Sequence, residues 1–250
     1  SADGTGPAAT FKHPKGITTD GTNLYVVGNS NNIIRKIVIS SGVVTTIAGS
    51  AGSSGSTDGT GPDARFDGPY GITTDGTNLY VADTNNSTIR KIVISTGVVS
   101  TFAGYAGSRA STDGTGTAAR FNKSREISTD GTNLYVSDTG NHKIRKIVIS
   151  TGVVTTYAGS GSYGSADGTG TAATFHTPSG NVIDGTNLYV ADAANRKIRK
   201  ISFLRETHTA GVALHNLDDE TNVTVELASS DTGEATVSPA TLTFKENNWN

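Results

Sequence analysis

The sequence contains no cysteine and no methionine, and it has one tryptophan and six prolines in 250 residues. The lack of cysteine excludes disulfides, thiol catalysis and thiolate metal sites. Charged residues are scarce at 17% and the net charge is −2, so no basic field is available to hold nucleic acid or an anionic membrane. No apolar run approaches the about 18 residues of a membrane-spanning helix. We therefore expect neither a nucleic-acid partner nor a membrane span.

Glycine, by contrast, is abundant, with 31 residues that fall mainly at fixed positions of a repeat. The block D-G-T-N-L-Y-V occurs four times, and its tyrosines are spaced by 55, 55 and 54 residues. These tyrosines are Tyr25, Tyr80, Tyr135 and Tyr189. A period of about 50 residues that contains four short strands is typical of a propeller, in which no single unit can bury its own apolar faces. The sequence therefore predicts an all-β radial array.

Each repeat predicts four strands, which in the first unit are 16–19, 24–27, 33–39 and 43–48. Asp20-Gly21 predicts a tight turn, because glycine readily adopts positive φ. The third strand has apolar residues on both faces, as expected for a blade packed between two neighbours. A Gly/Ser-rich connector leads to the segment D-G-T-G-x-x-A-x-F of the next unit. We expect the phenylalanines of these segments to pack between blades: Phe11, Phe66, Phe121 and Phe175.

The third copy carries the pattern Asp138-x-x-Asn141-His142-x-Ile144-Arg145, preceded by Asn-Leu-Tyr-Val and followed by a V-V-T-T-x-A-G strand. This pattern resembles the NHL repeat, and its copies cover residues 1–203. The resemblance implies an NHL-type β-propeller, which usually has six blades, whereas four units are present here. Either the ring is incomplete or four blades close by themselves, which the known range of blade numbers allows.

Two units depart from the NHL pattern. Gly28 replaces the aspartate in the first unit, and the fourth unit lacks the V-V-T-T-x-A-G strand after Phe203. The character of the sequence changes at this point, so we expect two domains, at 1–203 and 204–250. Residues 207–214 could supply the missing outer strand of the fourth blade.

Residues 221–250 resemble part of the Calx-beta-like or Ig-like repeats that are common in bacterial surface proteins. The expected strands of this segment are 223–227, 235–237 and 241–244. An Ig-like sandwich needs about 100 residues, so we expect open sheet edges. Unpaired edges are templates for another strand. We expect flanking domains or neighbouring copies to complete them, in a larger polypeptide or a filament.

The two faces of the predicted ring differ in how much the repeats vary. The D-G-T-N turns of one face are identical in all four units, whereas the turns and connectors of the other face, here called the loop face, differ. Repeat arrays usually carry their binding loops on one such face. Candidate binding residues on the loop face are Asp83, Asn86, Asp138, His142, Asp192 and Arg196. Neutral drift in surface loops is the alternative explanation.

The D-x-x-N-x-x-I-R turn could also hold calcium or an anion, but a structural role is favoured. Asp83 and Asn86 can bond turn amides, and Arg90 can lie across a neighbouring blade and pair with aspartate. The D-G-T-G loops carry one carboxylate each, which is too few for a calcium loop. We expect no metal at either place.

A second candidate site lies at the mouth of the central channel, where the sequences of the predicted inner strands differ between repeats. The first two units have Lys-Gly-Ile and Tyr-Gly-Ile, the third has Arg125-Glu126-Ile127, and the fourth has Ser-Gly-Asn. Candidate residues at this channel mouth are His13, Lys15, Tyr70, Arg125, Glu126, His176 and Asn181. A solvated salt bridge between Arg125 and Glu126 is the alternative.

No Ser/His/Asp triad, phosphate-cradling loop or paired-carboxylate site can be proposed from the sequence. We expect a non-enzymatic, extracellular or cell-surface binding or structural module of bacterial type, with a protein or glycan ligand on the loop face and no cofactor. The rival is a lyase or hydrolase, because the resemblance extends to metal-using NHL enzymes such as the peptide-amidating lyases. Its metal would lie near His13 and His176. The repeat equivalents of these histidines form no ring of ligands, and a zinc site needs three.

Overall fold

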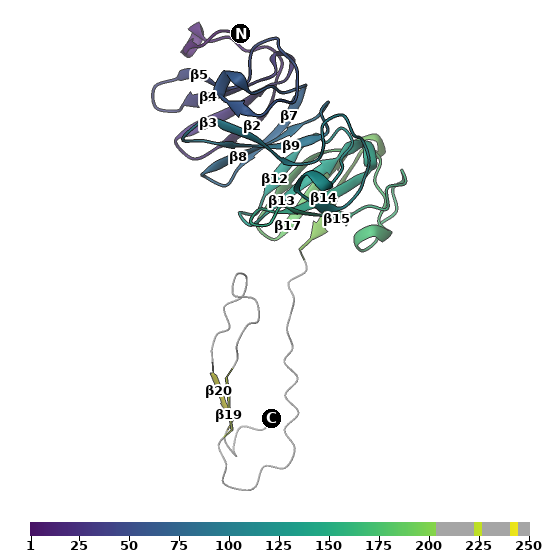
Figure 1. Cartoon of the computed structure of the whole chain (residues 1–250). Helices are drawn as coiled ribbons and strands as arrows, with labels where there is room; N and C mark the ends of the chain where they lie inside the picture. Colours follow the sequence, from purple (N-terminus) through teal and green to yellow (C-terminus); the bar gives the residue numbers. More distant parts are fainter. Residues whose placement is uncertain (204–222, 227–240, 245–250) are drawn as a thin grey trace. The chain divides into compact units, whose positions relative to one another are not determined.

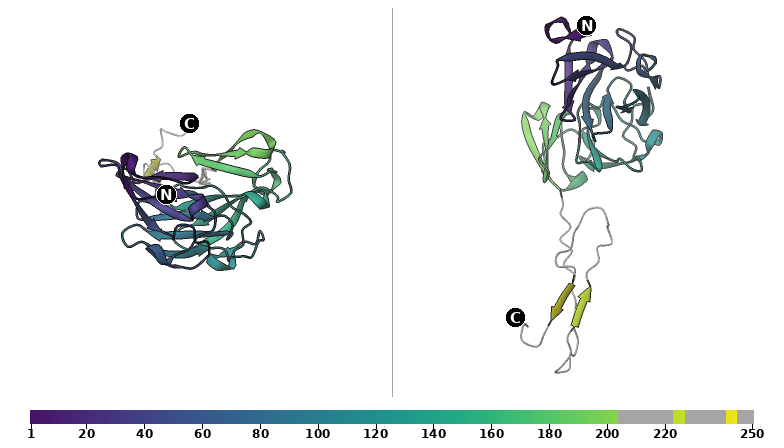
Figure 2. Two further views of the ribbon diagram at one scale, coloured as in Figure 1. Left: turned by 90° about the horizontal axis from the view of Figure 1, so that it is seen from above. Right: turned by 90° about the vertical axis from the view of Figure 1, so that its left-hand side faces the viewer.

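The computed structural model describes residues 1–203, 223–226 and 241–244. The chain divides into two units, Ser1–Phe203 and Leu204–Asn250. The first unit consists of four antiparallel sheets whose innermost strands contact one another in chain order (Figure 1). Figure 2 shows these sheets from two further directions, from purple for the first to light green for the fourth. This arrangement is a β-propeller of four blades, which confirms the all-β fold predicted from the repeat.

Within the described residues, blades 1 to 3 have five strands each and blade 4 has three. Blade 1 contains β1 (Gly4–Thr5), β2 (Pro14–Thr19), β3 (Asn23–Gly28), β4 (Ile33–Val38) and β5 (Val43–Ala48). Blade 2 contains β6 (Gly59–Thr60), β7 (Pro69–Thr74), β8 (Asn78–Asp83), β9 (Thr88–Val93) and β10 (Val98–Ala103). Blade 3 contains β11 (Gly114–Thr115), β12 (Ile127–Thr129), β13 (Asn133–Asp138), β14 (Lys143–Val148) and β15 (Val153–Ala158). Blade 4 contains β16 (Pro178–Ile183), β17 (Asn187–Asp192) and β18 (Lys197–Ser202).

The helices of the described chain are single 3₁₀ turns. Four follow the D-G-T segments of the repeats: η1 (Gly6–Ala8), η3 (Gly61–Asp63), η4 (Gly116–Ala118) and η6 (Gly170–Ala172). Three lie in turns of the loop face: η2 (Asn29–Asn31), η5 (Thr139–Asn141) and η7 (Ala193–Asn195). No helix in the part of the chain that the structure describes is long and apolar enough to cross a membrane.

A short outer strand completes each of the first three blades. In blade 1, Gly4 and Thr5 pair with Val44 and Val43 of β5, and β6 and β11 pair in the same way with β10 and β15. The expectation of four-stranded blades was therefore wrong. The D-G-T-G segment has turn-forming residues but runs extended along the outer edge. Each of these blades starts at its outer edge and then crosses to its innermost strand.

One carboxylate organises each of the identical D-G-T-N turns. In blade 3, Asp130 Oδ1 accepts the backbone N–H groups of Thr132 and Asn133 at 2.9 and 2.6 Å. Its Oδ2 accepts the Asn133 side-chain amide and the Tyr135 hydroxyl, both at 3.1 Å. Burial opposes the charge of Asp130, but these hydrogen bonds outweigh it and lower the pKa of the carboxyl. The identity of this face between repeats is therefore explained by folding.

Three hydrophobic clusters join consecutive blades. The rings of Phe66, Phe121 and Phe175 are 0%, 0% and 1% exposed, and each lies in a cluster shared with the preceding blade, as predicted. Phe11 occupies the same repeat position in blade 1 and is 38% exposed, because the described chain places no blade before blade 1. The core is therefore made between blades, and a single blade cannot complete it.

The two end faces of the array expose residues that are buried inside it. Ile198 of β18 is 74% exposed, whereas Ile89 and Ile144 at the same repeat position are 0% exposed. At the other end, Ile17 of β2 is 60% exposed, whereas Ile72 of β7 is 3% exposed. Among the described residues, no hydrophobic cluster joins blade 4 to blade 1. Within residues 1–203, both ends of the array therefore present a blade face that no other blade covers.

Blade 4 lacks an outer strand within the described residues, where β18 has β17 as its only neighbour in the sheet. The outer strand expected at 207–214 lies outside the described residues, as does the strand expected at 235–237. In the second unit, β19 (Val223–Glu226) and β20 (Thr241–Phe244) form an antiparallel pair. This pair alone does not assign a Calx-beta-like or Ig-like sandwich.

Candidate functional site

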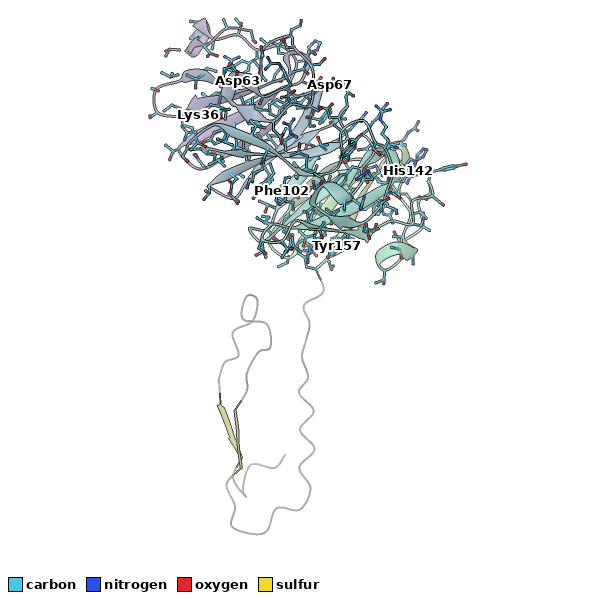
Figure 3. All side chains as sticks on the ribbon, in the orientation of Figure 1. Lys36, Asp63, Asp67, Phe102, His142 and Tyr157 are labelled. Carbon is cyan, nitrogen blue, oxygen red and sulfur yellow. The ribbon has the colours of Figure 1, made fainter. Side chains whose placement is uncertain are left out.

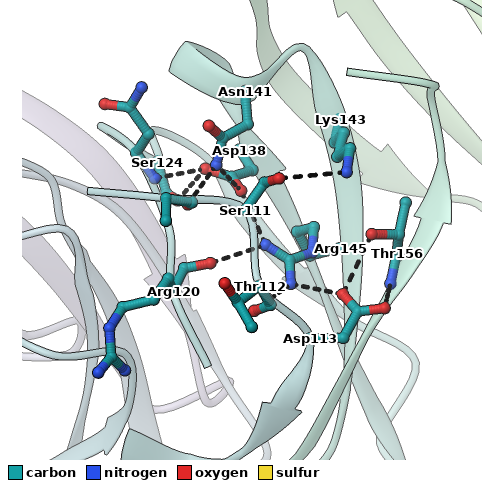
Figure 4. Close-up of polar contacts among 12 residues, drawn as sticks. Ser111, Thr112, Asp113, Arg120, Ser124, Asp138, Asn141, Lys143, Arg145 and Thr156 are labelled. Atoms are coloured by element: carbon teal, nitrogen blue, oxygen red, sulfur yellow. Dashed lines mark hydrogen bonds and ion pairs between the residues drawn. The ribbon is translucent and has the colours of Figure 1, made fainter. Parts of the chain in front are cut away.

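The arginine of the D-x-x-N-x-x-I-R motif is buried and holds two aspartates (Figure 4). In blade 3, Arg145 Nη1 lies 3.0 Å from Asp138 Oδ2, and Nη2 lies 2.7 Å from Asp113 Oδ1. The side chains of Arg145 and Asp138 are fully buried, whereas that of Asp113 is 49% exposed. Arg90 and Arg199 make the same two kinds of ion pair in blades 2 and 4.

Hydrogen bonds complete the surroundings of this buried pair. Asp138 accepts the side-chain amide of Asn141 and the backbone N–H of Asn122, both at 2.8 Å. Arg145 donates to the carbonyl oxygens of Arg120 and Thr112 at 2.9 and 3.0 Å. Both carboxylate oxygens of Asp138 are thus engaged inside the protein. A structural role explains the motif.

Blade 1 shows which contacts of the arginine recur in every blade. Gly28 replaces the inner aspartate there, yet Arg35 is buried and pairs with Asp3 at 2.9 Å. Arg35 also donates to the carbonyl oxygens of Ala2 and Thr10, at 2.8 and 3.1 Å. The outer aspartate and two backbone carbonyls therefore recur in all four blades, while the inner carboxylate is confined to blades 2 to 4.

Four of the six loop-face candidates belong to this structural network: Asp83, Asn86, Asp138 and Asp192. Burial raises the pKa of Asp83 to about 6, against the lowering effect of its hydrogen bonds and of Arg90. The other two candidates, His142 and Arg196, end their turns with left-handed backbone at φ 56°. The side chains of these two residues lie outside the ion-pair network.

The channel-mouth candidates Lys15, Tyr70 and Arg125 lie in consecutive blades. Lys15 Nζ of β2 lies 5.5 Å from the ring centroid of Tyr70 on β7, and the Arg125 guanidinium lies 5.7 Å from it. The Gly71 N–H donates to the Arg125 carbonyl at 2.9 Å, which joins β7 to blade 3. A Cβ at Gly71 would lie 2.5 Å from that oxygen, so glycine is required there. The result is one aromatic ring with a cation from each neighbouring blade.

Glu126 and Asn181 lie beside this row of side chains. Burial raises the pKa of Glu126 to about 7, and its carboxyl accepts one hydrogen bond, from the Ile127 N–H at 3.3 Å. The salt bridge with Arg125 that the sequence allowed is absent from the ion pairs of the described residues. The Asn181 amide donates to Ser137 Oγ at 2.9 Å and to the Glu126 carbonyl at 3.3 Å. Blades 3 and 4 therefore meet through polar groups at the channel mouth.

The two histidines assigned to the channel mouth lie with the turns of the loop face. His13 Nδ1 is 2.6 Å from Ser30 Oγ, in the turn before β4. The His176 ring lies 5.6 Å from the ring of His142, which Figure 3 labels, and 5.5 Å from that of Tyr163. Within the described ranges, no group of three or more His, Cys, Asp or Glu side chains gathers as a metal site would require.

Tyr163 was not among the residues singled out from the sequence. It lies in a Gly/Ser-rich connector, where the other two connectors have Ser54 and Arg109 at the same repeat position. An aromatic residue in such a connector is the signal that could have identified it. Its neighbours His142 and His176 come from different segments, so their meeting could not be seen from the pattern.

Known proteins are similar to this chain in sequence and in structure. No family model matches the sequence. NHL repeat-containing protein 2 of Bos taurus is 35% identical over 147 residues, which are 54% of this chain and 20% of that protein. A structural genomics protein of unknown function from Bacteroides thetaiotaomicron is similar at a TM-score of 0.64 and 29% identity, over 76% of this chain and 47% of that one.

Two further structures share the fold at lower identity. An auxiliary nutrient binding protein from Bacteroides ovatus has a TM-score of 0.61 and 20% identity, over 78% of this chain and 49% of that one. Virginiamycin B lyase from Staphylococcus aureus has a TM-score of 0.52 and 20% identity, over 80% of this chain and 55% of that one. The chain thus spans about half the length of the structures that it matches, and a fifth of the bovine relative.

The inner aspartate of the motif gives a testable prediction. Asp138→Ala should lower the free energy of unfolding by about 3–5 kcal/mol, because it leaves the buried charge of Arg145 without its inner partner. Asp113→Ala is the matched control on the same arginine, and we expect a loss of about 1 kcal/mol or less because Asp113 is half exposed. Urea denaturation measures both, and equal losses would contradict the distinct roles given to the two aspartates.

The Glu126 carboxyl gives a prediction about pH. Its pKa in the folded chain, about 7, lies above the ordinary value of 4.5, so the folded state binds the proton more tightly than the unfolded state. The free energy of unfolding should therefore fall as pH rises through this window. Glu126→Gln removes the titrating group, so the stability of the variant relative to the parent should increase between pH 4.5 and 7. Parallel stability profiles of the two proteins would refute the raised pKa.

The first unit of the chain is therefore an all-β, four-bladed propeller similar to NHL-repeat proteins.

Proposed function

We propose that the chain is a non-enzymatic binding module that holds its ligand on the loop face. The observation that carries this proposal is the contrast between the two faces. The invariant D-G-T-N aspartates organise hairpins, and the motif arginines bind aspartates of their own blades. Many residues that differ between repeats lie on the loop face, and some of them, such as His142 and Arg196, lie outside these networks. One structural neighbour is named an auxiliary nutrient binding protein, although at 20% identity that likeness concerns the fold alone.

The rival function is that of a lyase or hydrolase with a metal at the central channel. Virginiamycin B lyase shares the fold, again at 20% identity. His13 bonds Ser30 in one turn and His176 packs against His142 in another, so they do not form one set of ligands. A zinc site needs three protein ligands, and the described residues bring no such group together. Glu126 alone could act as an acid or base, because burial raises the pKa of its carboxyl to about 7.

We also propose an extracellular or cell-surface location, with a protein or glycan as the ligand. This rests on the near-neutral charge, on the variable loop face and on the resemblance of residues 221–250 to segments of bacterial surface proteins. Labelling of intact cells with a membrane-impermeant reagent checks the location. A chain that is labelled only after lysis would contradict it.

Exchange of the variable loops tests the binding proposal. In the exchange variant, residues 138–142 and 192–196 carry the sequence of residues 83–87, and residues 160–166 carry that of residues 106–112. Glycan and peptide arrays should show ligands of the parent chain that the exchange variant no longer binds, while its circular dichroism spectrum is unchanged.

A control changes the opposite face by Thr132→Ser and Thr186→Ser and should retain the bound ligands. Identical array profiles for the parent chain and the exchange variant would contradict the assignment of the ligand to the loop face. Turnover of an array compound by the parent chain would favour the enzyme instead.

We further propose that copies of the chain bind head to tail through their end faces. Ile34 of blade 1 and Ile72 of blade 2 lie in one hydrophobic cluster. Ile198 and Ile17, which are exposed at the two ends, are the repeat counterparts of these two residues. The repeat thus makes one end of the array complementary to the other, as in a heterologous interface.

Sedimentation equilibrium of two variants tests this association. Ile17→Glu and Ile198→Glu each damage one end face, so neither variant alone should self-associate. Their equimolar mixture should contain dimers, because one intact face remains on each partner. A mixture that stays monomeric, together with a monomeric parent chain, would show that the end faces do not bind each other.

A further inference from the structure

Three aromatic rings gather at one junction of the loop face, between blades 3 and 4. His142 ends the turn before β14, Tyr163 lies in the connector after β15, and His176 precedes β16. The ring centroids are 5.6 Å apart for His142 and His176, 5.5 Å for Tyr163 and His176, and 6.4 Å for His142 and Tyr163. We propose that these rings form a binding platform for a neutral carbohydrate. The inference rests on the proposed binding function of the loop face and names its ligand class.

The three rings replace non-aromatic residues of the other repeats, whereas the backbone connection at this junction is the same. Tyr163 joins Phe175 through the same isolated β-bridge as its counterparts in the other two connectors. At the repeat positions of the three rings, the other two junctions have Ser87, Arg109 and Asn122, and Asn32, Ser54 and Asp67. Residues of other sizes and chemistry thus occupy these positions without changing the connection between blades. Packing of the blades does not require the rings.

Tyr163 has the largest exposed fraction among the large hydrophobic side chains of the described residues, at 75%. An exposed ring of this kind offers a flat apolar surface, and its hydroxyl remains available for a hydrogen bond. The cluster is therefore not a buried core that happens to contain aromatic residues. It leaves ring surface open to a ligand.

One of the three rings presents a fixed hydrogen-bond donor. The Thr177 N–H donates to His142 Nδ1 at 3.0 Å. Equivalent bonds at the other two junctions run from the backbone of Lys123 to Ser87 and from that of Gly68 to Asn32. Because Nδ1 accepts this structural bond, the proton of the neutral His142 ring sits on Nε2, where it can be donated to a ligand oxygen. Burial, and next His176, lower the pKa of His142, which favours this neutral form.

The chemistry of the cluster favours a neutral ligand over a charged one. The Tyr163 phenol and the His142 imidazole, whose lowered pKa favours the neutral form, offer no ion pair to an anion. Lys143, whose side chain lies against the same connector, would repel a cation, and its Nζ already bonds Ser111 Oγ at 3.4 Å. A Cβ at Gly161 in that connector would be 3.0 Å from Lys143 Cε. A sugar ring has C–H faces that stack on aromatic rings and hydroxyl groups that accept and donate hydrogen bonds at its edge. The combination of ring faces and polar edges suits it.

Binding of neutral polysaccharides tests this inference. Affinity electrophoresis and isothermal calorimetry of the full chain with dextran, mannan, xylan and a β-glucan should identify at least one ligand. Tyr163→Ser should weaken its binding at least tenfold, and serine at the equivalent position of another connector shows that the backbone accepts the change. His142→Ser should also weaken binding, although serine keeps the structural bond, as Ser87 does.

The matched control is Tyr105→Ser, which removes the 58% exposed tyrosine of the preceding connector and should leave binding unchanged. Unaltered binding by Tyr163→Ser would overturn the carbohydrate platform. So would the failure of every polysaccharide in the panel to bind. The exchange variant on peptide arrays separates this failure from that of the loop face itself. If the parent chain binds a peptide that the exchange variant does not bind, the loop face is a binding site and its ligand is a peptide, not a carbohydrate.

Discussion

One buried arginine in each blade ties together segments that are far apart in the sequence. Arg145 holds the outer strand through Asp113, the connector through the Thr112 carbonyl and the loop-face turn through Asp138. Its guanidinium also lies 5.1 Å from the ring centroid of Phe121, which fills the space against the preceding blade. A buried charge that loses its buried partner, here Asp138, costs several kcal/mol. The turn, the connector and the outer strand of a repeat are therefore constrained as a set.

This constraint decides where function can reside. Residues that complete the arginine network or the D-G-T-N turn cannot change freely, so they are alike in most blades. Differences between blades are found in the turns and connectors of the loop face and at the start of the inner strands. Tyr70, between a lysine and an arginine from its two neighbouring blades, and the ring cluster around Tyr163 are both of this kind.

The fold was largely predictable because its signals are local and repeated. Tyrosine spacing and D-G-T-N turns gave the blades, and the recurring phenylalanines gave the packing between them. The outer strand Gly4–Thr5 was not predictable, because turn-forming residues become extended only through pairing with distant β5. The Arg125–Glu126 salt bridge was the alternative that adjacency allowed, but the Arg125 guanidinium lies near Tyr70 of the preceding blade. The role of Tyr163 was not predictable, because the rings that it lies against, His142 and His176, come from other segments.

The position of the outer strand has a consequence for how such an array changes length. Because β1, β6 and β11 belong to the blade that follows them in the chain, each complete repeat carries all the strands of its own sheet. A duplication or deletion with both ends in Gly/Ser-rich connectors would add or remove a whole blade. No sheet would then need a strand from another repeat. Growth by gene duplication can therefore proceed one blade at a time, with the same pair of end faces after every step.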